Sequence, residues 1–355
     1  VNVVQVAPSI SATIGEAFGL PAGTDVNAKL AKALRMLGFD HVFDTTFAAD
    51  VTIMEEAHEL VERIKNKEPG PMISTCCPAW IKFMEQEFPD VIPNMSTCKS
   101  PMQMMGALVK SYWAKKKNID PKKIFSVAIM PCTAKKFEAE RPEFVTDGNK
   151  NTDAVLTTRE LTRMLKTAGI DLAKIPDGHF DDPLGESTGA GKIFGSAGGV
   201  MEAALRTAYW MVNKKNLEKV EITDVRGLTG IQKAIVQITP DLVVKTVATS
   251  SLSNARKVCE LIRAGKADFD FVEIMACPGG CINGGGQPRD AHDEGDNLEK
   301  RATCLYRLDQ QNPRRCSHEN QSVIALYDQY LKEMGSEEAH HLLHTRYYPR
   351  EQVDE

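Results

Sequence analysis

The sequence has no apolar run long enough to span a membrane and no excess of basic residues. A transmembrane helix needs about 18 or more apolar residues in a row, and no stretch approaches that length. The formal net charge is -5, whereas nucleic-acid binding normally requires a basic surface. The first residues also lack the basic, apolar and small-residue order of a signal peptide. We therefore expect a soluble, cytoplasmic protein with no membrane or nucleic-acid partner.

The sequence also lacks the compact cysteine motifs of small metal-binding modules. It has neither the closely spaced cysteine run of ferredoxin-type clusters nor the paired C-x-x-C motifs of zinc modules. Its nine cysteines are an odd number, which argues against a complete disulfide framework and for reduced thiols that serve metal or redox chemistry. Because the cysteines are scattered, a shared site would have to be assembled by folding.

Short apolar runs alternate with helical patterns, which predicts an α/β fold with parallel sheets. We expect one domain over residues 1–355, with a first lobe at about 1–150, a second at about 151–284 and a helical C-terminal tail at about 285–355. Each lobe should hold a mostly parallel sheet flanked by helices, with the active site in the cleft between the lobes. Because the chain begins inside the strand-like run "VNVVQVAP", we interpret it as a domain excised from a longer protein.

Helical periodicity is strongest in five segments, at about 26–37, 49–64, 159–167, 198–212 and 255–264. In the second segment, Glu56, Glu59 and Arg63 lie along one flank of an apolar arc, within about 60° of one another. Glu56 borders that arc and is therefore expected to lie next to the core.

Three cysteine motifs each follow a predicted strand. Cys76 and Cys77 follow "PMIS", Cys132 follows "FSVAIMP", and Cys277 and Cys281 follow "FVEIMA". Ligands of open parallel sheets bind beyond the carboxyl ends of the strands, so these motifs should converge. A [4Fe-4S] cluster takes four thiolates, which Cys77, Cys132, Cys277 and Cys281 would supply. Neighbouring side chains point in different directions, which leaves Cys76 for another role.

The motifs "STCCPAW", "MPCTAKKFEAE" and "EIMACPGGCINGGGQP" resemble the three signature motifs of the [FeFe]-hydrogenase catalytic domain, in the expected order. The segments "QVAPSISATIGEAFG", "KIFGSAGGVMEAALRTA", "SHEN" and "HHLLHTRYY" resemble the same family, so the similarity spans nearly the whole chain. The resemblance implies a ferredoxin-type hydrogenase, an oxidoreductase that interconverts protons and H2. It also implies ferredoxin or a similar electron carrier as partner, maturation proteins for assembly, and a monomeric state.

The resemblance further implies a two-part cofactor, the H-cluster. A [4Fe-4S] cluster would be bridged by Cys281 to a diiron subcluster carrying CO, cyanide and an azadithiolate, and Lys135 would hydrogen-bond a cyanide. Cys76 would pass protons to the bridgehead amine, and a relay through Glu56, Ser96, Glu59 and Arg63 would continue to the surface, with Ser96 bridging the two glutamates. The remaining residues implied to line the diiron pocket are Met130, Met275, Ala7, Pro8, Ser9 and Phe194.

Plainer interpretations remain for several of these residues. Cys76 could be an inert buried thiol, Glu56 and Glu59 a solvated helix flank, and Lys135 a surface lysine. On spacing alone, Met130 and Met275 would be core residues. The other thiols and the histidines near the C-terminus are interpreted as packing residues, although the histidines could suggest a metal; they are Cys98, Cys259, Cys304, Cys316, His340, His341 and His344.

The chain departs from the family pattern after "KSP", where Met102 stands in place of a frequent glutamine, so a polar contact near the diiron site is expected to be missing. The run "AKKKNIDPKK" is either a solvated helix end or a dock for an acidic ferredoxin. Three other functions compete with the hydrogenase hypothesis: a non-catalytic homologue in iron-sulfur protein assembly, a hydrogen sensor, and a structural zinc domain.

Overall fold

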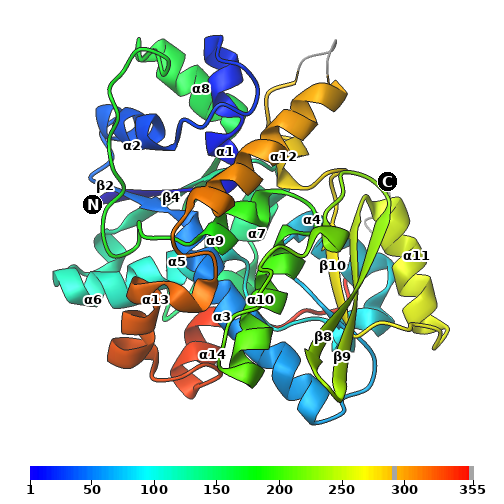
Figure 1. The fold of residues 1–355 in the computed structure, drawn as a ribbon. Helices are drawn as coiled ribbons and strands as arrows, with labels where there is room; N and C mark the ends of the chain where they lie inside the picture. The colour runs from blue at the N-terminus through cyan, green and yellow to red at the C-terminus, as the bar shows by residue number, and fades with distance from the viewer. Residues whose placement is uncertain (290–293, 352–355) are drawn as a thin grey trace.

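Two four-stranded sheets form the framework of the computed structural model, which describes residues 1–289 and 294–351 (Figure 1). The first sheet has the strand order β2-β1-β4-β7 and is parallel throughout. In the second, β3-β10-β9-β8, only the β8–β9 pair is antiparallel. The strands of these sheets are β1 (Asn2–Val6), β2 (His41–Asp44), β3 (Met72–Ile73), β4 (Phe125–Met130), β7 (Ala154–Thr157), β8 (Ile231–Thr239), β9 (Leu242–Ser250) and β10 (Phe271–Met275). A small ribbon of β5 (Val145–Thr146) and β6 (Asn149–Lys150) lies apart from them.

The α/β architecture with mostly parallel sheets is as predicted, but the two sheets do not divide the chain at residue 150. β7 belongs to the first sheet, although it follows that position, and β3 belongs to the second sheet, although it precedes it. Parallel strands are joined by crossover connections, so the chain passes back and forth between the sheets. The predicted lobe boundary therefore does not coincide with the boundary between the sheets.

The five predicted helices are all present, and their ends differ by a few residues. The largest shift is in α3, which begins at Thr45 because the Asp44 carboxylate caps it by accepting a hydrogen bond from the Thr46 amide at 3.0 Å. The last long helix, α12, lies in the predicted helical tail at about 285–355. The helices are α1 (Pro8–Ser11), α2 (Asn27–Met36), α3 (Thr45–Lys65), α4 (Pro78–Glu87), α5 (Pro101–Leu108), α6 (Ala114–Lys117), α7 (Ala134–Ala139), α8 (Thr158–Thr167), α9 (Gly189–Lys192), α10 (Gly199–Asn213), α11 (Leu252–Arg263), α12 (Glu294–Gln311), α13 (Gln321–Leu326) and α14 (Glu337–Leu343).

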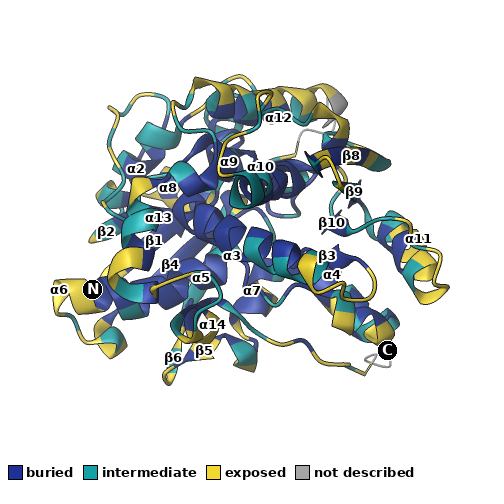
Figure 2. Ribbon diagram, turned by 60° about the horizontal axis from the view of Figure 1, so that its bottom comes forward, coloured by how far each residue is buried: buried dark blue, intermediate teal, exposed yellow. Residues whose placement is uncertain are grey.

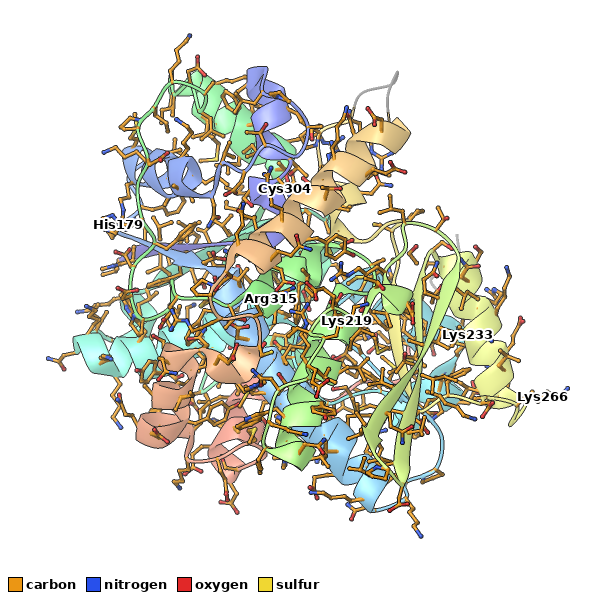
Figure 3. The ribbon with its side chains drawn as sticks, viewed as in Figure 1. His179, Lys219, Lys233, Lys266, Cys304 and Arg315 are labelled. Carbon is orange, nitrogen blue, oxygen red and sulfur yellow. The ribbon has the colours of Figure 1, made fainter. Side chains whose placement is uncertain are left out.

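None of the helices within the described ranges combines the length and apolar character needed to cross a bilayer. The helices instead cover the sheets and one another. Lys266, just beyond α11, lies at the outer edge of the molecule (Figure 3).

Helix α3 is the central element of the fold. It packs against α5, α9 and α10, and Figure 2 shows it largely buried. Burial extends to the carboxylates of Asp50, Glu55 and Glu56, whose exposures are 1% or less. Burial of a carboxylate costs free energy unless the group is hydrogen-bonded or protonated. The three carboxyl groups of this helix must therefore be hydrogen-bonded or protonated in the core.

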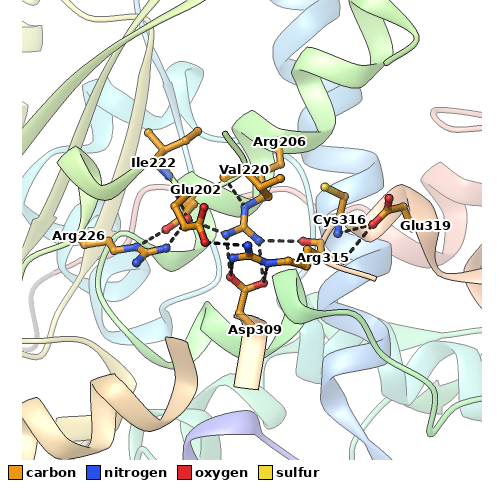
Figure 4. Close-up of polar contacts among 10 residues, drawn as sticks. Glu202, Arg206, Val220, Ile222, Arg226, Asp309, Arg315, Cys316 and Glu319 are labelled. Carbon is orange, nitrogen blue, oxygen red and sulfur yellow. Dashed lines mark hydrogen bonds and ion pairs between the residues drawn. The ribbon is translucent and has the colours of Figure 1, made fainter. Parts of the chain in front are cut away.

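A buried network of charges fastens the C-terminal segment to α10 (Figure 4). Arg206 is bound bidentately by Asp309, at 3.0 and 2.9 Å, and also donates to Glu202 at 2.7 Å. Arg315 donates to Oδ2 of Asp309 at 2.6 Å, and Arg226 donates to Glu202 at 2.7 Å. Because each charge has an opposite partner, the network avoids the penalty of an isolated buried ion.

Candidate functional site

A cavity opens where the loops after β1, β3, β4 and β10 meet, at the carboxyl ends of parallel strands in both sheets. It holds about 780 Å³ of empty space, its mouth included. Every residue expected to bind the cofactor or its metals lines this cavity, together with Cys76. They are Ala7, Pro8, Ser9, Cys76, Cys77, Met130, Cys132, Lys135, Phe194, Met275, Cys277 and Cys281. The sequence motifs therefore meet in one place.

Local structure explains how the cysteine loops converge. Cys77 directly precedes α4, with Pro78 at the first helical position, where its fixed φ suits a helix start. Gly284 lies so close to the Pro131 backbone that an added Cβ would be 2.3 Å from the Pro131 carbonyl oxygen. Gly280, at φ 91°, would place a Cβ 2.6 Å from the Ala197 nitrogen. The glycine-rich loop thus packs tightly against two other loops, which brings its cysteines beside Cys132.

The four expected ligand cysteines are all free thiols, and the pKa values of Cys132, Cys277 and Cys281 are raised. Burial, helped by the neighbouring Cys77 and Cys132, raises the pKa of Cys277 to about 12. Burial also raises the pKa of Cys281, and the other three thiols add to that effect. Because Cys77 and Cys132 act on both Cys277 and Cys281, the four sulfurs share one electrostatic environment.

The spacing of these sulfurs fits a cluster better than a single ion. Four thiolates around one zinc, at about 2.3 Å each, would lie about 3.8 Å apart. Within residues 1–289 and 294–351, no three of the four sulfurs lie within 4.8 Å of one another. Four thiol donors at wider spacing are what a [4Fe-4S] cluster requires.

The remaining lining of the cavity is mostly apolar, with two polar groups in reach of a bound anion. The Ser9 hydroxyl is fully buried and has no hydrogen-bond partner among the described residues. The Lys135 ammonium donates to the Cys76 carbonyl at 3.0 Å and pairs with Glu138 at 2.7 Å. Burial alone would lower the pKa of Lys135, but the Glu138 carboxylate raises it, so the lysine stays charged. Met102 also lines the cavity with an apolar side chain, which agrees with the expected loss of a polar contact.

Glu56 is buried in α3 and carries a strongly perturbed carboxyl group. Burial is the main cause of the rise in its pKa to about 8, and the charges of Glu59 and Glu273 contribute to it. In the described structure, Oε2 of Glu56 and the Ser74 hydroxyl both lack a hydrogen-bond partner. A carboxyl group with this pKa exchanges its proton near neutral pH.

The outer residues of the expected relay are hydrogen-bonded to one another. The Ser96 hydroxyl donates to Glu59 at 2.7 Å, and Arg63 lies 3.4 Å from the same carboxylate. Arg63 also donates to the Met95 carbonyl at 3.1 Å. Within the described residues, however, no hydrogen bond joins Ser96 to Glu56. The structure therefore shows the contact of Ser96 with Glu59 but not the expected bridge between the two glutamates.

Two fully buried glutamates near the site escaped the sequence prediction. Glu273 lies within β10 and accepts hydrogen bonds from the amides of Gly198 and Met201 at the start of α10, each at 2.7 Å. Burial raises its pKa to about 7. Glu55 accepts from Tyr327 and contacts His344 at 3.0 Å. The position of Glu273 inside the apolar run "FVEIM" could have identified it as a buried charged residue. No feature of the sequence indicates which residues contact Glu55.

Known hydrogenases resemble this chain along its whole length. NADP-reducing hydrogenase subunit HndD of Solidesulfovibrio fructosivorans is 48% identical over 359 residues, which cover 99% of this chain and 61% of that protein. Iron hydrogenase 1 of Clostridium pasteurianum is 45% identical over 351 residues, 97% of this chain and 60% of that protein. The chain thus spans about 60% of the length of these two relatives. The solved structure of an apo [FeFe]-hydrogenase HydA1 variant from Chlamydomonas reinhardtii superposes with a TM-score of 0.87 at 42% identity, covering 99% of this chain and 95% of that one.

A second group of relatives is more distant. The cytosolic Fe-S cluster assembly factor narfl of Danio rerio is 31% identical over 365 residues, 99% of this chain and 87% of that protein.

Two family descriptions match the chain directly: "Iron only hydrogenase large subunit, C-terminal domain" over residues 1–285, and "Iron hydrogenase small subunit" over residues 295–350. From the convergence of the cysteine motifs and the match over residues 1–285, the chain belongs to the iron-only hydrogenase family.

Proposed function

We propose that this chain is the catalytic domain of an [FeFe]-hydrogenase that reversibly reduces protons to H2. The observation that carries the proposal is the convergence of four free cysteines, Lys135 and a fifth thiol, Cys76, on one largely apolar cavity. An inert structural site would not need an ammonium group and a spare thiol beside its ligands.

The residues of the cavity fit the cofactor that the family implies. Bound here, a [4Fe-4S] cluster and a diiron subcluster with CO, cyanide and azadithiolate would supply the electron exchange and the hydrogen chemistry. Cys77, Cys132 and Cys277 would hold the [4Fe-4S] cluster, and Cys281 would join it to the diiron subcluster. Lys135 would donate a charge-assisted hydrogen bond to a cyanide, worth about 1.5 to 3 kcal/mol.

The walls of the cavity would serve to exclude water. Met130, Met275 and Phe194 present soft apolar surfaces, and the chain turns at Ala7 and Pro8 to close the cavity from the side of β1. A dry environment strengthens every electrostatic contact made inside it. The unpartnered Ser9 hydroxyl would gain its missing hydrogen bond from the bound group.

We propose that protons travel from the surface to Cys76 through Arg63, Glu59, Ser96 and Glu56. Glu59, Ser96 and Arg63 are already connected. A pKa of about 8 lets Glu56 hold a proton and release it near neutral pH. The unpartnered Oε2 of Glu56 leaves the carboxyl group free to turn, or to bind a water molecule, so that it alternately meets Ser96 and Cys76.

We further propose ferredoxin or a similar carrier as the electron donor, maturation proteins as the source of the diiron subcluster, and a cytoplasmic monomer as the working form. The four ligand cysteines, Cys77, Cys132, Cys277 and Cys281, are only half-buried. A cluster bound by them would lie close to the surface, where a carrier docked outside the chain reaches it.

A role in iron-sulfur protein assembly is the second candidate, because the assembly factor narfl covers 99% of this chain at 31% identity. The resemblance predicts that such relatives lack Cys76, Lys135 and the two pocket methionines, all of which line the cavity here. A hydrogen sensor is less favoured because the relay residues Glu56, Glu59 and Ser96 are present.

Infrared spectroscopy combined with a hydrogen assay tests the proposed function. Produced without maturation enzymes, the chain should bind about four Fe, as one [4Fe-4S] cluster requires, and evolve no H2. Matured with those enzymes, it should show CO and cyanide stretching bands and evolve H2 from a reduced carrier. Robust H2 evolution before maturation would contradict the diiron assignment. A chain that never acquires the infrared bands would favour the assembly role.

A further inference from the structure

Three potential metal ligands meet at the outer end of the proposed relay. A carboxylate oxygen of Glu59, the sulfur of Cys98 and a ring nitrogen of His344 all lie within 4.8 Å of one another. They come from α3, the loop before α5 and the end of α14. These segments are far apart in the sequence, so only the fold creates this group.

The chemistry of the three donors suits a divalent ion of the zinc class. Thiolate, imidazole and carboxylate are the ligands that zinc takes in proteins. The Cys98 thiol points at Oε2 of Glu59 across 3.9 Å, so its proton now lies between two of the donors. Loss of that proton would give the group two negative charges, which a divalent cation neutralises.

The orientation of His344 provides a second, independent indication of a metal site. Its Nε2 contacts the fully buried carboxylate of Glu55 at 3.0 Å, and Glu55 is held in turn by the Gly335 amide at 3.0 Å. A metal-binding histidine usually gives its other ring N–H to such a carboxylate. Nδ1 of His344 is the nitrogen on the Glu59 side, because it contacts the Thr97 hydroxyl at 2.7 Å and the Thr97 amide donates to Glu59 at 3.1 Å.

The three donors are mostly buried, but two of their side chains are partly exposed to solvent. The side chains of His344 and Glu59 are 7% and 15% exposed. The exposed His340 ring lies over His344, with 4.2 Å between the ring centroids. A water molecule or the neighbouring His340 would supply the fourth ligand.

A second trio offers a matched comparison within the same chain. Cys316, His318 and Glu319 also bring their donor atoms within 4.8 Å of one another. Both ring nitrogens of His318, however, face the neutral side chains of Thr207 and Asn216, at 3.2 and 2.7 Å. Its ring therefore lacks the carboxylate that supports His344, and this trio is the weaker ligand set.

We propose that Glu59, Cys98 and His344 form a binding site for a zinc-class divalent cation, and that its occupancy blocks proton exchange at Glu59. Binding breaks the Cys98 S–H bond, forms a metal–sulfur bond and releases one proton to solvent, with no change in oxidation state. The blocking effect rests on the proposed function, whereas the binding does not.

Binding is tested on the chain with its [4Fe-4S] cluster in place and no diiron subcluster, so that the four ligand thiols of the cavity are occupied. Under anaerobic conditions, Co2+ should add thiolate-to-cobalt absorption to the difference spectrum, with about one ion bound and one proton released per chain, and Zn2+ should abolish the signal. Cys98→Ala and His344→Gln should lose this signal, and Cys316→Ala should keep it. Glu55→Gln should weaken binding by about 10- to 100-fold. A signal that survives in Cys98→Ala, or none in the wild type, would overturn the site.

The blocking effect is tested on the matured protein. Zn2+ should slow H2 evolution by the wild type, a chelator should reverse the effect, and Cys98→Ala should resist it. If Zn2+ binds through Cys98 but leaves turnover unchanged, the proton route through Glu59 is wrong and the metal site stands. If Zn2+ slows both proteins equally, inhibition arises elsewhere and the blocking proposal is refuted.

Discussion

Replacement of Glu56 by glutamine should change both the pH dependence of stability and the rate of turnover. The pKa of this carboxyl group is raised from 4.5 to about 8 by burial. A raised carboxyl pKa means that the folded chain binds more protons than the unfolded chain, so the free energy of unfolding falls as pH rises from about 4.5 to about 8. The slope for one group is at most about 1.4 kcal/mol per pH unit.

Glutamine has the shape of the protonated side chain but does not titrate. Between pH 5.5 and 8, the stability of Glu56→Gln should therefore rise relative to the wild type by roughly 3 kcal/mol, slightly less than the product of that slope and the pH interval because the slope falls off near pH 8. Above about pH 8 the difference should level off. Urea unfolding of the cluster-loaded chain at several pH values measures it. The exposed Glu62, on the same helix and paired with Lys65 at 2.8 Å, supplies the control: Glu62→Gln should follow the wild type.

Turnover provides the second measurement. If Glu56 carries protons, Glu56→Gln should slow H2 evolution by about 10²- to 10⁴-fold, the usual contribution of a positioned acid-base group, while the infrared bands persist. Stability curves of wild type and variant that run parallel between pH 5.5 and 8 would refute the raised pKa. Near wild-type turnover with intact bands would refute the route through Glu56.

Substitutions at three further residues test the other roles assigned to the cavity. Lys135→Ala should impair uptake of the diiron subcluster but leave the [4Fe-4S] signal in electron paramagnetic resonance, because the ammonium binds an anion and no iron; loss of that signal would mean that Lys135 supports the fold or the cluster. Cys77→Ala should remove or destabilise the [4Fe-4S] cluster, which iron analysis detects, and an unchanged iron content would exclude Cys77 as a ligand. Cys76→Ala should keep both metal units and lose turnover by about 10²- to 10⁴-fold. Cys76→Asp should restore part of that turnover with a more acidic pH optimum, because the unperturbed pKa of aspartate is about 3.9 against about 8.5 for a thiol, and equal rates for the alanine variant and the wild type would assign Cys76 to packing.

Much of the fold could be predicted because its signals are local. Apolar runs identified β1, β3, β4 and β10, and helical periodicity identified the five helices, whose residues interact mostly with near neighbours in sequence. β8 was missed: its alternating pattern, in "IQKAIVQIT", became a strand by pairing antiparallel with β9. The division of the strands between the two sheets could not be predicted, because β3 pairs with β10 across about 200 residues and no local signal specifies such a partner.

For the site, the sequence determined which residue types are available and where they stand relative to strand ends. That was enough to bring Cys77, Cys132 and Cys281 to one cavity, since parallel strands present their carboxyl ends to the same side. Tertiary structure alone decided the electrostatics. Glu56 acquires its pKa of about 8 because neighbouring elements remove it from water, and Glu55 finds Tyr327 and His344 from the C-terminal segment. Burial and long-range contacts set the free energy of a charge, and both arise only when distant segments pack together.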